Sequence, residues 1–144
     1  MASNRHLSRI AVVQALFAWE FRGGDPEAEY TYIIQEFYPK LDSVEFGLNN
    51  LKGILEKRDE IIRIIEEHAS QWSFDKIAPV DRVILQQGVY EIIACDDVPP
   101  VVVINEAIEI AKSCAGENSS KFINGVLSNV MKQYRPQPPK SKKK

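Results

Sequence analysis

The sequence predicts an all-α fold of six or seven helices, arranged as two short bundles joined near Trp72. Apolar residues recur at steps of three and four along nearly the whole chain, as on the buried face of a helix. Short breaks containing Gly, Pro or Asp separate these segments, and a sheet would find no second strand to pair with. At 144 residues and 44% hydrophobic composition, the chain is long enough to bury one compact core.

The first predicted helix begins at Ser3 or Asn4 and ends at the Gly-Gly-Asp-Pro break, residues 23–26. Its later turns are apolar on nearly every side, which predicts a buried helix. Asp25 is placed to cap the next helix, and Pro26 suits its first position because the N–H that proline lacks has no partner there. This second helix ends at Pro39.

The longest predicted helical segment follows, from Asp42 to Ala69. Asp42 and Glu45 have the spacing of a capping box, in which each side chain accepts a hydrogen bond from the other residue's backbone N–H. The wide apolar face of the segment predicts a bundle helix rather than an isolated coiled coil. After a polar and aromatic joint around Trp72, Pro79 suits the first position of the next helix.

Two later stretches contain residues typical of a strand or a turn, but the residues around them predict a helix in both cases. Residues 101–103 are three consecutive valines, but the apolar stripe continues at helical spacing to residue 111, with Gly116 placed to end the helix. Asn124 and Gly125 form a typical hairpin pair. Because the apolar residues around them fall four apart, we interpret the pair as lying inside a helix, with Gly125 allowing a neighbouring helix to approach closely.

Charge is distributed unevenly along the chain. The net charge is −2, but the last ten residues carry five Lys or Arg and no acid. Taking those five from the 18 basic residues leaves 13 against 20 acidic residues, so residues 1–134 carry −7. We therefore expect a folded domain over residues 1–134 and a disordered Pro/Lys-rich tail over residues 135–144. Any contact with nucleic acid has to come from a local basic patch.

The cysteines and the N-terminal region indicate the compartment. Cys95 and Cys114 lie in apolar stretches without CxxC spacing, so we expect two buried thiols in a reducing environment. The first 20 residues lack a cleavage site, and no apolar run approaches the length of a bilayer span. These features predict a cytoplasmic protein without membrane association.

The first turn of the chain is the main candidate for a binding motif. Arg5 and Arg9 are four residues apart, so on a helix their side chains project from one face, with His6 beside them. Two cations at a helix start oppose the macrodipole, which favours a role in binding phosphate. The alternative is an ordinary solvated helix end.

Catalytic and metal-binding motifs are not found. Glu106 and Glu109 form a carboxylate pair, but a di-metal bundle would need Glu-x-x-His motifs, and neither histidine lies three residues after a glutamate. There is no GxSxG, Walker or GxGxxG motif. We therefore expect a non-enzymatic protein with no cofactor and no metal.

Three stretches resemble the NusB family of bacterial transcription antitermination factors: AVVQALFAWE (11–20), DRVILQQGVYEI (81–92) and VPPVVVINEAIEIAKSCAGENSSKFINGVLSNV (98–130). The resemblance implies an all-helical, non-enzymatic protein built from two small bundles. It also implies partners: the boxA element of nascent RNA, the ribosomal protein NusE, and the RNA polymerase antitermination complex that favours ribosomal RNA transcription. Some members of the family form homodimers, so a homodimer is a further possibility.

The resemblance also implies site residues. The family's arginine-rich motif corresponds to Arg5, His6 and Arg9, and an aromatic near the RNA corresponds to Phe17, one turn after Gln14. Further residues on the RNA side are Asn118, Lys121 and Phe122, and Asp81 lies on the face that receives NusE. We expect the RNA-binding residues to form one small cationic, aromatic strip made by the first and last helices.

The chain departs from the family pattern at several of these positions. Leu7 and Ser8 stand where basic or small residues are common, and each lost phosphate contact weakens binding and its salt dependence. Asn118 replaces an acid, which removes a repulsion toward phosphate near Lys121. Two alternatives therefore stay open: a protein-interaction module that has lost RNA recognition, and an RNA-binding factor in ribosome assembly or rRNA modification.

Overall fold

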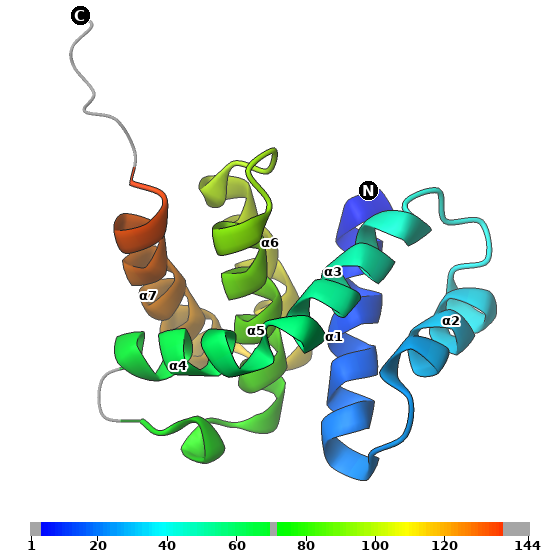
Figure 1. Ribbon diagram of the computed structural model, residues 1–144, viewed down its shortest axis with the longest axis horizontal. Coiled ribbons are helices and arrows are strands. Elements are labelled where there is room, and N and C mark those ends of the chain that lie inside the picture. The colour runs from blue at the N-terminus through cyan, green and yellow to red at the C-terminus, as the bar shows by residue number, and fades with distance from the viewer. Residues whose placement is uncertain (1–3, 70–71, 137–144) are drawn as a thin grey trace, which may run out of the picture.

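The computed structural model describes residues 4–69 and 72–136. These residues form α-helices and one 3-10 helix, with no strand among them, and the predicted all-α fold is confirmed (Figure 1). The seven α-helices, with the 3-10 helix η1 between the fourth and fifth, are α1 (Asn4–Arg22), α2 (Pro26–Phe37), α3 (Val44–Glu56), α4 (Arg58–His68), η1 (Phe74–Lys76), α5 (Pro79–Ala94), α6 (Pro100–Cys114) and α7 (Glu117–Tyr134).

The helices form two packed groups that meet along α5 (Figure 1). In one group α1 packs against α2 and α3, and in the other α5 packs against α4, α6 and α7. Because α1 and α3 also contact α5, the two groups share one core. Helix α5 is accordingly buried on nearly every side from Val83 to Val89.

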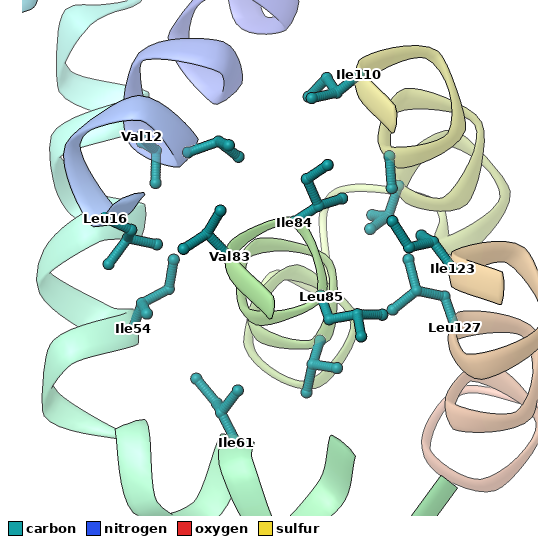
Figure 2. Packing of buried hydrophobic residues seen from close by; sticks show 14 of the residues in the cluster. Val12, Leu16, Ile54, Ile61, Val83, Ile84, Leu85, Ile110, Ile123 and Leu127 are labelled. Atoms are coloured by element: carbon teal, nitrogen blue, oxygen red, sulfur yellow. The ribbon is translucent and has the colours of Figure 1, made fainter. Parts of the chain in front are cut away.

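Figure 2 shows how α5 fills the centre of this core. Val83 points toward Leu16 and Ile54 of the first group, whereas Leu85 points toward Leu127 on the opposite side. All five side chains are fully buried. Helices pack against α5 on both sides, and its buried polar residues Gln86, Gln87 and Glu91 are hydrogen-bonded within the core.

The predicted junction near Trp72 and the single helix over residues 42–69 are both wrong. The segment is divided at Lys57 (φ −102°, ψ 19°), which ends α3 and precedes α4. The Lys57 N–H still donates to the Gly53 carbonyl at 2.9 Å, and the Lys57 carbonyl accepts from Ile61 at 2.9 Å. The helical sequence pattern therefore continues without interruption across the bend. The bend is evident only from the packing, since α3 packs on α1 and α4 packs on α5.

Helix starts are predicted correctly in most cases. Asp25 caps α2 by accepting from the Glu27 N–H at 3.0 Å, and Pro26 and Pro79 occupy first positions. At α3 the cap is Ser43 rather than the predicted Asp42. Its hydroxyl pairs with that of Ser8 at 2.7 Å, which joins the start of α3 to α1.

The Asn124–Gly125 pair lies inside α7, as predicted, but Gly125 has a different role from the one expected. Among the described residues, nothing lies within 4 Å of the position that a Cβ would take at Gly125. Close packing occurs instead at Gly53, where a Cβ would lie 2.1 Å from the Tyr90 hydroxyl. Gly116, between α6 and α7, has φ +122° and lets the chain reverse.

The remaining expectations have mixed outcomes. Cys95 is half-buried and Cys114, the last residue of α6, is exposed, so the prediction of two buried thiols is wrong for Cys114. Of the expected tail, Arg135 is described and donates to the carbonyl of Cys95 at 3.1 Å, whereas residues 137–144 lie outside the described residues. No helix in the described ranges is long and apolar enough to cross a bilayer.

Candidate nucleic-acid interface

The outer face of α1 presents aromatic rings to solvent. Residues three or four apart lie on the same side of a helix, and Gln14, Phe17 and Phe21 share the side turned away from the core. The side chains of Phe17 and Phe21 are 37% and 80% exposed. Their rings lie parallel, 3° between planes with centroids 6.3 Å apart. Exposed aromatic rings of this kind can stack on unpaired bases.

Arg9 does not belong to this surface. Its Nε and Nη2 atoms donate to the two carboxylate oxygens of Glu91 in α5 at 2.6 and 2.8 Å. The side chains of Arg9 and Glu91 are only 4% and 1% exposed, and Gln87 also donates to Glu91. Burial alone would lower the pKa of Arg9, but the hydrogen bonds and charge of Glu91 outweigh that effect, and the pKa is raised. The predicted phosphate ligand is thus a buried bridge between α1 and α5.

The helical position of Arg9 explains this difference. Arg9 lies one turn before Val12 and Val13 and two turns before Leu16, all of which are buried. The apolar spacing was therefore a signal that Arg9 points inward. No sequence pattern identifies Glu91 as its partner, since the two residues are 82 positions apart.

Arg5 and His6 occupy more accessible positions. Arg5 is exposed, and its guanidinium lies 4.2 Å from the centre of the Phe46 ring in α3. His6 is half-buried, and its Nδ1 lies 2.5 Å from a carboxylate oxygen of Glu106 in α6. The same oxygen lies 3.5 Å from Arg9. Two acids that the sequence did not assign to the motif, Glu91 and Glu106, thus hold the start of α1 against α5 and α6.

The second group of predicted residues lies where α5 and α7 begin. Asn118 and Lys121 are exposed on the first turns of α7, whereas Phe122 is half-buried. Phe122 lines a pocket together with Asp81 of α5. The sequence assigned these two residues to different partners, but the structure places them side by side.

Asp81 is unusual among the charged residues of the protein. It is 7% exposed, and its Oδ1 accepts no hydrogen bond from the described residues. Burial raises the pKa of its carboxyl, while the Ser119 hydroxyl acts in the opposite direction. A buried carboxylate oxygen without a donor carries a free-energy cost, which a ligand that supplies an N–H or O–H can offset.

The structure does not bring the two predicted groups together. Helices α1 and α5 are antiparallel, because Arg9 contacts Glu91 near one end while Glu20 contacts Arg82 near the other. The start of α7 lies beside the start of α5, so it is level with the last turns of α1. At about 1.5 Å per residue, roughly 20 Å separates Arg5 from that end. The expected single strip is therefore wrong: Arg5 is at one end, and Phe17 lies toward the other.

A cluster of charged and polar side chains that the sequence did not predict lies at this second end of α1. Glu20 of α1 accepts from Arg58 of α4 at 2.5 Å and from Gln86 of α5 at 2.8 Å. Arg82 lies 3.4 Å from the same carboxylate, which joins three helices. In the parts of the chain that the structure describes, no three His, Cys, Asp or Glu residues are grouped so that they could hold a metal ion.

Comparison with known proteins identifies relatives of this chain. The NusB family model matches residues 6–132. The transcription antitermination protein NusB of Halalkalibacterium halodurans is 37% identical over 133 residues, which is 92% of this chain and 97% of the relative. That of Methylacidiphilum infernorum is 38% identical over 133 residues, 92% of each chain.

Two solved structures are similar throughout. T. maritima NusB matches with a TM-score of 0.85 and 38% identity, over 94% of this chain and 96% of the other. A crystal structure of the antitermination factors NusB and NusE in complex with dsRNA contains a chain that matches with a TM-score of 0.84 and 30% identity, over 93% of this chain and all of the other.

Proposed function

Because the chain belongs to the NusB family, we propose that it is a transcription antitermination factor that acts by binding RNA together with a protein partner, and not by catalysis. In this proposal the RNA is of the boxA type, the partner is the ribosomal protein NusE, and the assembly acts with RNA polymerase in the cytoplasm to promote ribosomal RNA transcription. The observation that carries the proposal is the likeness to a solved NusB bound to NusE and dsRNA.

The geometry suggests how the RNA is held. Phe17 and Phe21 provide rings for base stacking, and Gln14 on the same face offers an amide to a base edge. Arg5 and Lys121 are exposed cations suited to phosphate. Asn118, on the first turn of α7 and three residues before Lys121, supplies an exposed neutral hydrogen-bonding group. This set spans the length of α1, so it fits an extended strand better than a compact ligand.

The other predicted residues have supporting roles. Arg9 and His6 position the start of α1 through Glu91 and Glu106. We place the NusE contact around the start of α5, on its exposed residues. The buried carboxylate of Asp81 offers little surface to a protein partner.

Titration of a boxA-like RNA and a scrambled control, with and without NusE, at two salt concentrations tests this function. The boxA-like RNA is expected to bind more tightly than the control, and NusE is expected to strengthen the difference. Phe17→Ala should weaken binding by about 1–3 kcal/mol through loss of stacking. Tyr32→Ala, which removes an exposed ring from α2, is the matched control and should leave binding unchanged. Equal affinity for both RNAs in every condition would refute the proposal.

One observation favours a second function, that of a protein-interaction module without RNA selectivity. Burial of Arg9 against Glu91 leaves Arg5 as the exposed arginine of the N-terminal motif. Under this alternative NusE binds, but the boxA-like and scrambled RNAs compete equally for the complex. Under the main proposal, the plot of log K for RNA binding against log salt concentration has a negative slope. Arg5→Ala should reduce the magnitude of that slope by about 0.7, because one phosphate contact is lost.

A further inference from the structure

A pocket lies at the first turns of α1, where the segment that joins α2 to α3 passes beside that helix (Figure 1). Its volume is about 340 Å³, within the range of roughly 300–1,000 Å³ that drug-sized ligands occupy. It is lined by Asn4 and Leu7 of α1 and by residues 37–41. The lining combines two aromatic rings and further apolar groups with one cation, and no acidic side chain of the described residues belongs to it.

Leu7 places this pocket on the outer face of α1. Leu7, Gln14 and Phe21 are seven residues apart, close to two helical turns, so their side chains project from the same side of the helix. Phe17 lies on this side as well, and its ring and that of Phe21 are exposed. At about 1.5 Å per residue, roughly 15 Å of helix separates Phe17 from Leu7. The pocket therefore continues the aromatic surface proposed for RNA toward the start of α1.

The polar and aromatic groups of the pocket are accessible to a ligand. Phe37, the last residue of α2, is 67% exposed, and Tyr38 is half-buried. Asn4 and Lys40 are exposed. An unpaired base can stack on such a ring while a lysine holds the phosphate beside it, and an asparagine amide can both donate to and accept from a base edge.

We propose that the pocket holds one unstacked base of the RNA strand that runs along the outer face of α1, with the base against Phe37 and Tyr38 and its phosphate at Lys40. This inference rests on the proposed RNA-binding function and adds a subsite to it. A protein partner fits less well, because the NusE contact is placed beside the last turns of α1, about 20 Å along the helix from Leu7. The single cation and the acid-free lining also favour an anionic ligand.

The test replaces each nucleotide of a boxA-like RNA in turn by an abasic one, which keeps the phosphate and lacks the base. At the position that occupies the pocket, the replacement should weaken binding to the wild-type protein about tenfold, because the stacking of one base is lost. Phe37→Ala should weaken binding of the intact RNA by a similar factor, and it should abolish the abasic penalty at that position alone. Tyr32→Ala, which removes another exposed ring of α2, is the matched control and should keep every penalty.

Lys40→Ala tests the phosphate contact separately. It should reduce the magnitude of the slope of log K against log salt concentration by about 0.7, for the intact and the abasic RNA alike, because one phosphate contact is lost. Lys52→Ala, which removes an exposed cation of α3 outside the pocket, is the matched control and should leave the slope unchanged.

The outcomes separate this inference from the proposed function. If boxA-like RNA binds selectively but Phe37→Ala retains wild-type affinity, or retains every abasic penalty, the base subsite is refuted and the proposed function stands. If Phe37→Ala weakens NusE binding while RNA affinity is unchanged, the pocket takes a protein side chain and the inference is wrong. If boxA-like RNA is not preferred over the scrambled control, both fail. Thermal unfolding of the variants, followed by circular dichroism, shows that they are folded.

Discussion

Replacing Arg9 with alanine is expected to destabilise the fold strongly, because it leaves the Glu91 carboxylate buried. Arg9 supplies two hydrogen bonds to Glu91, at 2.6 and 2.8 Å, and both side chains are almost fully enclosed. Removing one partner of a buried ion pair costs about 3–5 kcal/mol. For a chain of this size, with about 2–4 °C per kcal/mol, the melting temperature should fall by roughly 6–20 °C.

The assay is thermal and urea unfolding followed by far-UV circular dichroism. Arg5→Ala is the matched control, since Arg5 is exposed and its contact with the Phe46 ring contributes about 0.5–1 kcal/mol at most. Arg9→Met combined with Glu91→Leu removes both charges and should recover much of the loss, because apolar pairs often replace buried ion pairs without cost. Equal, small effects of Arg9→Ala and Arg5→Ala would refute the structural role and return Arg9 to the RNA surface.

Three further predictions follow from packing and titration. Gly125→Ala should stabilise the protein by about 0.5–1 kcal/mol because its site is open, whereas Gly53→Ala should destabilise it by about 1–3 kcal/mol because a tyrosine ring occupies the space; urea unfolding compares them. Burial raises the pKa of Cys95 to about 11, so Cys114 should react with iodoacetamide at pH 8 while Cys95 reacts only as the pH approaches 11, as mass spectrometry can follow. Burial also raises the pKa of Asp81, so at pH values above the ordinary pKa of an aspartate the ionised carboxylate destabilises the folded protein. At pH 7, Asp81→Asn should therefore have a higher melting temperature than the wild type. Below about pH 4, where the carboxyl is protonated in both the folded and the unfolded protein, this difference should vanish.

Most of the fold follows from local sequence patterns. The helical period, the Asp25 cap and the prolines at first helical positions identify five of the seven α-helices with their approximate ends, and they place α3 and α4 together in one segment. These features depend on residues within one or two turns of each other, which is why they can be found without knowing the tertiary structure. The bend at Lys57 breaks no such pattern, since the backbone hydrogen bonds continue on both sides of it.

The candidate site is less predictable because its chemistry depends on distant partners. Spacing correctly placed Arg5 and Arg9 one turn apart, but the charge on Arg9 is neutralised by Glu91 from another helix. Phe21 is the most exposed aromatic ring of the described chain. The sequence did not predict it as a binding residue, because the exposure of a side chain depends on how the helices pack.

By itself, the sequence determined the helical class, most of the helix starts and the family, since each is expressed in residues close together in the chain. Only the tertiary structure decided which side of α1 faces water, and that Asp81 and Phe122 share a pocket while Arg5 lies at the far end. The physical reason is that periodicity fixes the angles between side chains on one helix. The neighbours that bury, pair or expose those side chains are chosen by packing between helices.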